Sequence, residues 1–143
     1  MSACTFFGHR DCPDSVKQKL KDTLVQLITE NGVDCFYVGN QGNFDALVYR
    51  VLCELRGIYP HITVTVVLAY MPTEETANRY GSDAILPEGI EAVPKRYAIS
   101  WRNKWMIEQA EYVVTYVTRS FGGAAIGAEM ARKNGLTRIA IGG

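Results

Sequence analysis

The sequence lacks an excess of either charge. Its 15 Lys and Arg residues are balanced by 15 Asp and Glu residues among 143, so the formal net charge is zero. Non-specific binding of nucleic acids needs Lys and Arg concentrated on one face to neutralise phosphates, so the balance argues against DNA as a partner. The 48% hydrophobic and 21% charged residues are typical of a globular chain. We expect a single domain over residues 1–143.

Long apolar segments and export signals are also missing. The longest apolar run, residues 62–71, is about half of the roughly 20 residues that span a bilayer, and it predicts a buried strand. The opening sequence MSACTFFGHR has neither the positive segment nor the apolar stretch of a secretion signal. We therefore expect a cytoplasmic protein with no membrane partner.

Cysteine is sparse and widely spaced. No CxxC pair occurs among Cys4, Cys12, Cys35 and Cys53. The spacing indicates neither a disulfide framework nor a zinc site, so a reducing compartment and no bound metal are expected. A redox role for Cys12 is a weaker hypothesis, which rests on its position before a predicted helix, where a thiol pKa can be lowered.

The common nucleotide-binding motifs are absent as well. No GxGxxG follows the first predicted strand, and GxxxxGK[ST] does not occur. This disfavours a standard NAD-dependent dehydrogenase or a P-loop protein, and we predict no cofactor.

What the sequence does contain is a regular alternation of apolar strands and amphipathic helices. We predict strands over 3–7, 34–38, 62–70, 112–117 and 137–141, and helices from about 11 to 31, over 43–57, over 96–110 and over 122–133. The strands are apolar along their whole length, which is typical of a parallel sheet covered on both faces. The predicted fold is therefore α/β, a Rossmann-like open, mainly parallel sheet of about five strands with helices on both faces. The interval 71–95 is predicted to be irregular and to act as a lid or binding loop.

Three loops that contain glycine follow predicted strands and lead directly into helices. In open α/β sheets the ligand binds beyond the carboxyl ends of the strands, where glycine exposes backbone amides and a helix start favours phosphate. The structural alternative is that these glycines only permit tight turns between strand and helix. Polar side chains beside them favour a binding site, and the predicted ligand-binding residues are Gly8, His9, Arg10, Gly39, Asn40, Gly42, Asp45, Gly122 and Gly123.

Two further positions carry charged side chains in helices. Arg102, followed by Asn103, either lies on a solvated helix face or clamps a phosphate with its planar guanidinium. Glu129 follows Gly122 by seven residues, which places both on one stripe of the last helix. The alternative for Glu129 is a solvated surface acid.

Gly8-His9-Arg10, Arg102-Asn103 with Met106, and the segment from Gly122 to Glu129 together resemble the SLOG superfamily. This group unites the DprA/Smf domain, the Lonely Guy phosphoribohydrolases and the YpsA-like uncharacterised bacterial proteins, of which the YpsA-like branch is the most similar. The resemblance covers nearly the whole chain. It implies a Rossmann-like domain that binds a nucleotide or a nucleotide-derived ligand.

Within this superfamily, the Lonely Guy enzymes cleave the N-glycosidic bond of nucleoside 5′-monophosphates with an arginine and the glutamate of a PGGxGTxxE motif. The resemblance implies these roles for Arg102 and Glu129. The sequence departs from that motif, since Phe121 replaces proline, residues 125–126 replace Gly-Thr, and Asn103 stands in place of lysine. These departures alter the expected phosphate cradle.

The leading hypothesis is a sensor or ligand-binding protein for a nucleotide or a derivative such as an ADP-ribose-like molecule. The alternative is a nucleoside-monophosphate N-glycosidase that uses Glu129 and Arg102. DNA binding, as in the DprA branch, is disfavoured by the neutral charge. The alanine-rich last helix offers a surface for a second copy, so we also expect a homo-oligomer.

Overall fold

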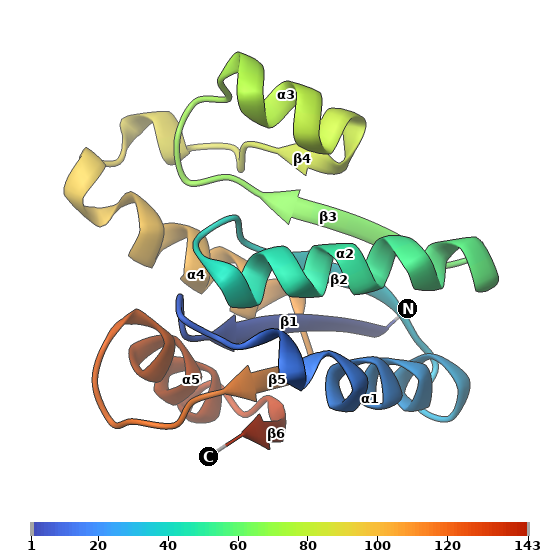
Figure 1. The fold of residues 1–143 in the computed structure, drawn as a ribbon. Coiled ribbons are helices and arrows are strands. Elements are labelled where there is room, and N and C mark those ends of the chain that lie inside the picture. The colour runs from blue at the N-terminus through green and yellow to red at the C-terminus, as the bar shows by residue number, and fades with distance from the viewer. Residues whose placement is uncertain (1, 143) are drawn as a thin grey trace.

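Six parallel strands form one sheet in the computed structural model, which describes residues 2–142 (Figure 1). The strand order is β4-β3-β2-β1-β5-β6. The chain builds outward from β1 to β4 and then returns to the other side of β1 to add β5 and β6. The strands are β1 (Ser2–Gly8), β2 (Val33–Val38), β3 (Thr63–Val67), β4 (Ala84–Ile85), β5 (Tyr112–Tyr116) and β6 (Thr137–Gly142). The predicted Rossmann-like α/β fold is confirmed, with one short strand more than expected.

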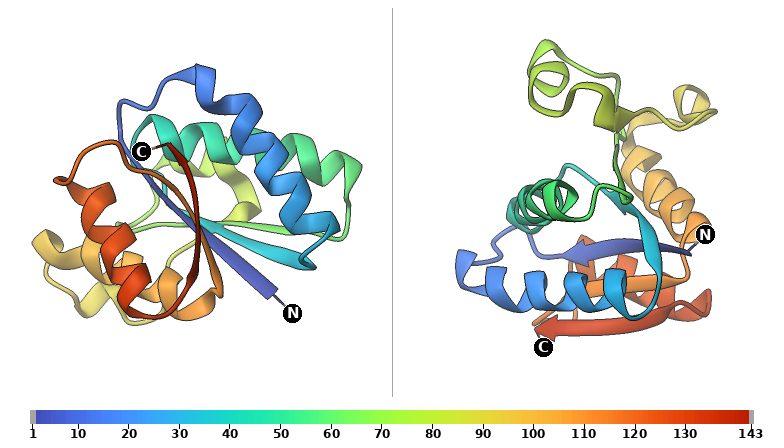
Figure 2. Two further views of the ribbon diagram at one scale, coloured as in Figure 1. Left: turned by 90° about the horizontal axis from the view of Figure 1, so that it is seen from below. Right: turned by 90° about the vertical axis from the view of Figure 1, so that its right-hand side faces the viewer.

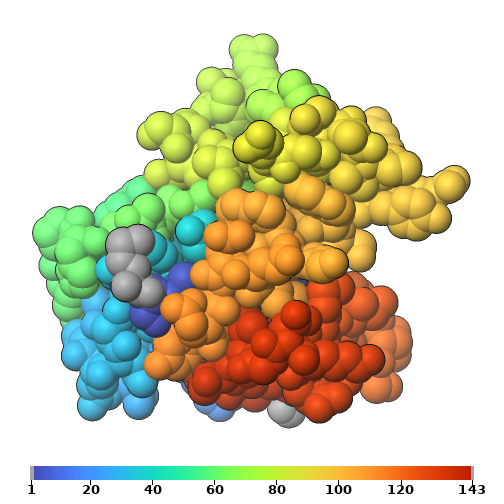
Figure 3. All heavy atoms as spheres, turned by 180° about the vertical axis from the view of Figure 1, so that it is seen from behind, coloured from blue at the N-terminus to red at the C-terminus, as the bar shows by residue number. Residues whose placement is uncertain are grey.

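Helices cover both faces of the sheet, as predicted (Figure 2). α1 (Lys17–Thr29) packs beside α2 (Asn43–Ile58) on one face, and α4 (Ala98–Gln109) packs beside α5 (Gly123–Lys133) on the other. Figure 3 shows α4 and α5 side by side from behind. No helix within residues 2–142 is long and apolar enough to cross a membrane.

The core has two layers because neighbouring side chains of a strand point to opposite faces of the sheet. On β1, Phe6 belongs to the larger core under α1 and α2, whereas Phe7 belongs to a smaller core under α4 and α5. α1 buries residues at positions 20, 24, 27 and 28, the spacing of one helical face. Each sheet face is thus covered by a pair of helices.

The interval 71–95 is not irregular, contrary to the prediction. It contains α3 (Glu74–Tyr80), which begins with a capping box between Thr73 and Thr76, and β4, which pairs with β3. Asp83 anchors this segment to α2 by accepting hydrogen bonds from Arg56 (2.9 Å to each carboxylate oxygen) and from Tyr49 (2.8 Å). A helix of seven residues and a strand of two are too short to show a hydrophobic period in the sequence.

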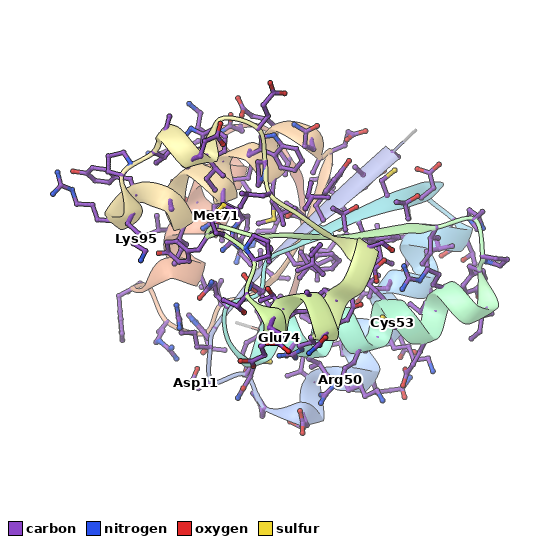
Figure 4. The ribbon with its side chains drawn as sticks, turned by 90° about the horizontal axis from the view of Figure 1, so that it is seen from above. Asp11, Arg50, Cys53, Met71, Glu74 and Lys95 are labelled. Atoms are coloured by element: carbon purple, nitrogen blue, oxygen red, sulfur yellow. The ribbon has the colours of Figure 1, made fainter. Side chains whose placement is uncertain are left out.

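The same segment borders an open, largely apolar hollow of about 600 Å³ beside the start of α4. Met71 and Lys95, which lie at the two ends of the segment, both line it (Figure 4). Whether the segment also moves as a lid stays a prediction.

The small residues of α5 allow it to lie close to the sheet. Gly127, Ala128 and Ala131 form its buried face, and a Cβ on Gly127 would lie 2.6 Å from the ring of Phe7. The small-residue stripe is therefore occupied by packing within the chain.

Gly8, at the end of β1, permits an equally close approach. A Cβ at this position would overlap the ring of Phe44, which is fully buried. We expect Gly8→Ala to lower the free energy of unfolding by about 1–3 kcal/mol, the usual cost of overpacking. Gly57→Ala is the matched control, because Gly57 lies in α2 with no atom near its missing Cβ, and this change should stabilise by up to about 1 kcal/mol.

Urea unfolding followed by circular dichroism would measure both variants. If Gly8→Ala were as stable as the unaltered chain, the ring of Phe44 would have moved aside at no cost, contrary to this packing.

Candidate functional site

A cleft of about 230 Å³ opens at the carboxyl ends of β1 and β5. These strands are neighbours in the sheet but far apart in the chain, so the loops that follow them diverge to opposite faces. This is the topological switch point at which open α/β sheets bind ligands. The cleft brings together eight of the predicted site residues, namely Gly8, His9, Arg10, Asp45, Arg102, Asn103, Gly122 and Gly123.

Arg102 is the most buried charged residue of the cleft. It lies on α4 with only 2% of its surface exposed. Its Nη1 donates to the carbonyl oxygen of Val67 (2.8 Å) at the end of β3, and its Nε donates to Oδ1 of Asn103 (2.9 Å). Burial lowers the pKa of the guanidinium, an effect that the nearby Asp45 opposes. Two of the three guanidinium nitrogens are therefore held in place.

The third guanidinium nitrogen of Arg102, Nη2, is free within the described part of the chain. It makes no hydrogen bond there, and no carboxylate oxygen lies within 4.0 Å of the guanidinium. Every fully buried polar side-chain atom of residues 2–142 has a hydrogen-bond partner. Because Nη2 has none, it must be at least partly accessible to solvent. Because Arg102 lines the cleft, we infer that Nη2 is accessible from the cleft.

Asp45 is the single carboxylate that lines the cleft within residues 2–142. It lies in the first turn of α2, and its Oδ2 accepts a hydrogen bond from the backbone N–H of Gln41 (2.8 Å). Burial raises the pKa of this carboxyl to about 6, although the Gln41 bond, Arg102 and Arg10 all act in the opposite direction.

Gly39 separates the buried Asp45 from the buried Arg102. A Cβ at position 39 would lie 2.9 Å from both Asp45 Oδ2 and Arg102 Nη1. A side chain at position 39 would displace one or both of these groups, so glycine lets Asp45 and Arg102 approach each other from α2 and α4 without forming a direct ion pair.

Gly39, Asn40 and Gly42 shape the cleft without lining it. Gly42 begins α2 at φ 91°, a left-handed conformation that favours glycine, and a Cβ there would lie 2.6 Å from Cα of Arg10. Asn40 is half-buried, and its Oδ1 accepts from the side-chain amide of Gln41 (3.3 Å). For this loop, the contacts within the chain agree with the alternative of tight turns.

His9 lines the cleft, but its Nε2 is occupied by a structural contact. It accepts a hydrogen bond from the backbone N–H of Thr118 (3.0 Å) and so ties the loop after β1 to the loop after β5. The residue is 3% exposed, and burial lowers its pKa, with Arg119 acting in the same direction. A neutral His9 thus holds the two loops at their present separation.

Arg119 and Gln41 also line the cleft and were not among the predicted residues. Arg119 donates to the exposed carboxylate of Asp11 (3.3 Å), which lies in the loop after β1 (Figure 4). Arg119 precedes Gly122 by three residues in the loop that follows β5. This position in the sequence could have identified Arg119 as a site residue. A basic side chain next to a glycine pair at a strand end is a candidate anion ligand.

The cleft is consequently positive in character. Three arginines, Arg10, Arg102 and Arg119, face one carboxylate. In addition, α5 starts at the cleft, and its N-cap residue Gly122 makes no side-chain cap bond, so the first backbone amides of the helix are open to a ligand. The partial positive charge of a helix start adds to that of the arginines.

The structure does not bring Glu129 to this cleft. Its carboxylate is exposed and bound by Arg132 (2.6 and 2.9 Å), which lowers the pKa of Glu129. It lines a separate hollow of about 440 Å³ with Ile126 and Lys133. The buried face of α5 is formed by Gly127, Ala128 and Ala131, and a residue two positions after Gly127 points away from that face.

Cys12 does not have the properties of a reactive thiol. The residue is 3% exposed, and burial, together with Asp11 and Asp14, raises its pKa to about 11. The position before a helix therefore does not activate it. Within residues 2–142, no group of three or more His, Cys, Asp or Glu side chains is arranged to hold a metal ion.

Neither protein-family models nor curated proteins match this sequence. Among solved structures, the X-ray structure of DNA processing protein A (DprA) from Streptococcus pneumoniae is similar, with a TM-score of 0.70 and 13% sequence identity. The likeness covers 98% of this chain and 50% of that chain, so this chain spans about half the length of that protein. At this identity the comparison shows the fold, a DprA-like α/β domain, as the SLOG resemblance implied.

Proposed function

We propose that this chain binds a phosphate-bearing, nucleotide-derived small molecule in the cleft between the ends of β1 and β5 and acts as a sensor or ligand-binding protein. The observation that carries the proposal is Arg102, a buried guanidinium whose Nη2 is open to the cleft and has no partner in the described chain. A charge taken out of water costs several kcal/mol unless it is paired. A phosphate oxygen from a ligand would supply that partner by a charge-assisted hydrogen bond.

The surroundings of Arg102 support a phosphate in particular. Arg10 and Arg119 line the same cleft, as do the first residues of α5, Gly123 and Ala124. A phosphate has several acceptor oxygens and can use cations and helix-start amides together. A cleft of about 230 Å³ has room for a further part of the ligand beside one phosphate.

The nucleotide character of the ligand is proposed from two arguments. The cleft lies at the switch point of a doubly wound sheet, the usual place for nucleotides in such folds. We further propose membership of the SLOG superfamily, near its YpsA-like branch, and the DprA-like fold is consistent with this. We do not propose DNA as the ligand, despite the name of the similar structure, because the net charge is zero and the cleft is small.

The alternative N-glycosidase requires Glu129 and Arg102 to act on one substrate. Glu129 lies outside the cleft in an ion pair with Arg132, so no observation favours this alternative. Glu129→Gln is accordingly a matched control for the binding experiment.

Isothermal titration of the purified chain would test the proposal with inorganic phosphate, pyrophosphate, AMP, ADP, ATP, ADP-ribose and NAD, and with adenosine as the ligand without phosphate. We expect saturable binding of at least one nucleotide, no binding of adenosine, and recovery of the nucleotide intact by mass spectrometry. At a hundredfold excess over Kd, the nucleotide should stabilise the fold by about 2.7 kcal/mol. The Glu129→Gln variant should bind equally well.

Binding of adenosine as tight as that of AMP, or no binding across the panel, would contradict the proposal. Release of free base that is lost in Glu129→Gln would establish the glycosidase in its place.

A further inference from the structure

Asp45 presents an unused acceptor to the cleft. Its Oδ2 is bound by the Gln41 amide, whereas Oδ1 has no hydrogen-bond partner within residues 2–142. The residue is only 8% exposed, yet it lines the cleft, and no fully buried polar side-chain atom there is unsatisfied. Oδ1 is therefore open to whatever the cleft holds.

A carboxylate in this place does not assist phosphate binding. An ionised carboxylate only accepts hydrogen bonds, and it repels an anion that lies close to it. Yet the chain holds Asp45 beside Arg102, with only Gly39 between them. A ligand that satisfies both side chains needs an anionic oxygen for the guanidinium and, a short distance away, a hydrogen-bond donor for the carboxylate.

We propose that Asp45 accepts a hydrogen bond from a ribose hydroxyl of the phosphorylated ligand and so selects a ribose phosphate over phosphates that lack this hydroxyl. The proposal rests on the proposed function, because it assumes a phosphate near Arg102. A sugar hydroxyl is a neutral hydrogen-bond donor that is joined to the phosphate through few bonds. This matches Asp45 and Arg102, which lie on either side of Gly39. Carboxylates bind ribose hydroxyls in the same way in dinucleotide-binding folds.

The size of the cleft agrees with this assignment. Pockets that enclose whole drug-sized ligands measure about 300–1,000 Å³. At about 230 Å³, the cleft is suited to a phosphate and a sugar, with a base near its open side. Discrimination should therefore depend more on the sugar than on the base.

The experiment compares the four ribonucleoside 5′-monophosphates with their 2′,3′-dideoxy counterparts, and inorganic phosphate, by isothermal titration at pH 8. The unaltered chain should bind at least one ribonucleotide about tenfold or more tightly than its dideoxy form, as expected for a hydrogen bond to a charged group. In Asp45→Asn, which keeps an acceptor for the Gln41 amide, this ratio should fall toward one. Inorganic phosphate should bind this variant as tightly as before or more tightly, because a negative charge has been removed.

Asp45→Ala is a second variant, and Glu129→Gln is the matched control, in which the ratio should not change. Equal affinity of the unaltered chain for ribo and dideoxy forms would overturn the hydroxyl contact, while their binding would leave the proposed function intact. A ratio that survives in both Asp45 variants would also overturn it. So would a folded Asp45→Asn that loses inorganic phosphate, since Asp45 would then serve the site structurally. If the unaltered chain binds no phosphate compound, the proposed function itself fails.

Discussion

Replacing Arg102 by methionine is expected to weaken binding of the phosphate ligand by a factor of about 30 or more. Truncating one partner of a buried, hydrogen-bonded charge pair usually costs about 2–5 kcal/mol of affinity, and each 1.4 kcal/mol is a factor of ten. Arg102 is suited to such a role because its Nη1 and Nε are already held by Val67 and Asn103, so Nη2 is positioned before the ligand arrives. Methionine preserves most of the length of the side chain and removes the charge.

Isothermal titration with AMP and with inorganic phosphate would measure the loss. Lys104→Met is the matched control, since it removes a positive charge from an exposed position of the same helix that does not line the cleft. Only a small change in affinity is expected for this control. Equal losses in both variants would show that overall charge, and not the positioned guanidinium, attracts the ligand.

Replacing Asp45 by asparagine should stabilise the ligand-free chain at neutral pH. Burial raises the pKa of the folded carboxyl to about 6, compared with about 3.9 for an unfolded aspartate. Between these two values the folded state binds more protons than the unfolded state, so the free energy of unfolding falls as pH rises through the window. A difference of about two pKa units corresponds to a penalty of roughly 3 kcal/mol at pH 7, which falls to about 0.5 kcal/mol at pH 4.

The groups that face Asp45 set the size of this effect. Arg102 from α4 and Arg10 from the loop after β1 lower the pKa of Asp45, and the Gln41 amide does so as well. On α3, Tyr80 is near enough for Asp45 to raise the pKa of its phenol. Burial outweighs all of these contributions, and the charge is therefore held at a net cost.

Urea unfolding at pH 4, 5, 6 and 7 would test this prediction. Asp45→Asn should be more stable than the unaltered chain at pH 7, and the difference should shrink as pH falls toward 4. Asp22→Asn, at an exposed position of α1, controls for the loss of one negative charge. If Asp45→Asn were the less stable protein at pH 7, attraction between Asp45 and Arg102 would outweigh burial.

Together, the two variants would separate stability from binding. The chain is expected to become more stable when Asp45 is neutralised and to bind poorly when Arg102 is removed. Both results would show that it keeps charged groups at the cleft at the expense of stability. Stabilising changes that reduce function are characteristic of binding sites.

The sequence by itself determined the class of fold and the end of the sheet that carries the cleft. Apolar strands that alternate with amphipathic helices predict a parallel sheet covered on both faces. Parallel strands end at one edge, so the glycine loops after 3–7, 34–38 and 112–117 had to gather there. Arg10, Asp45 and Gly122 could therefore be assigned to one site before the strand order was known, whereas Arg102 was a candidate because of the SLOG resemblance.

Only the tertiary structure decided which side chains reach the cleft. The approach of Asp45 to Arg102 depends on the missing side chain of Gly39, from a different loop. Arg119 reaches the cleft because β5 returns beside β1. Glu129 and Gly122 lie seven residues apart and so on one side of the helix, but this spacing does not predict which side of α5 is buried. Gly127 packs against Phe7, and Glu129 therefore points outward. These outcomes depend on contacts between distant segments, and local periodicity contains no information about them.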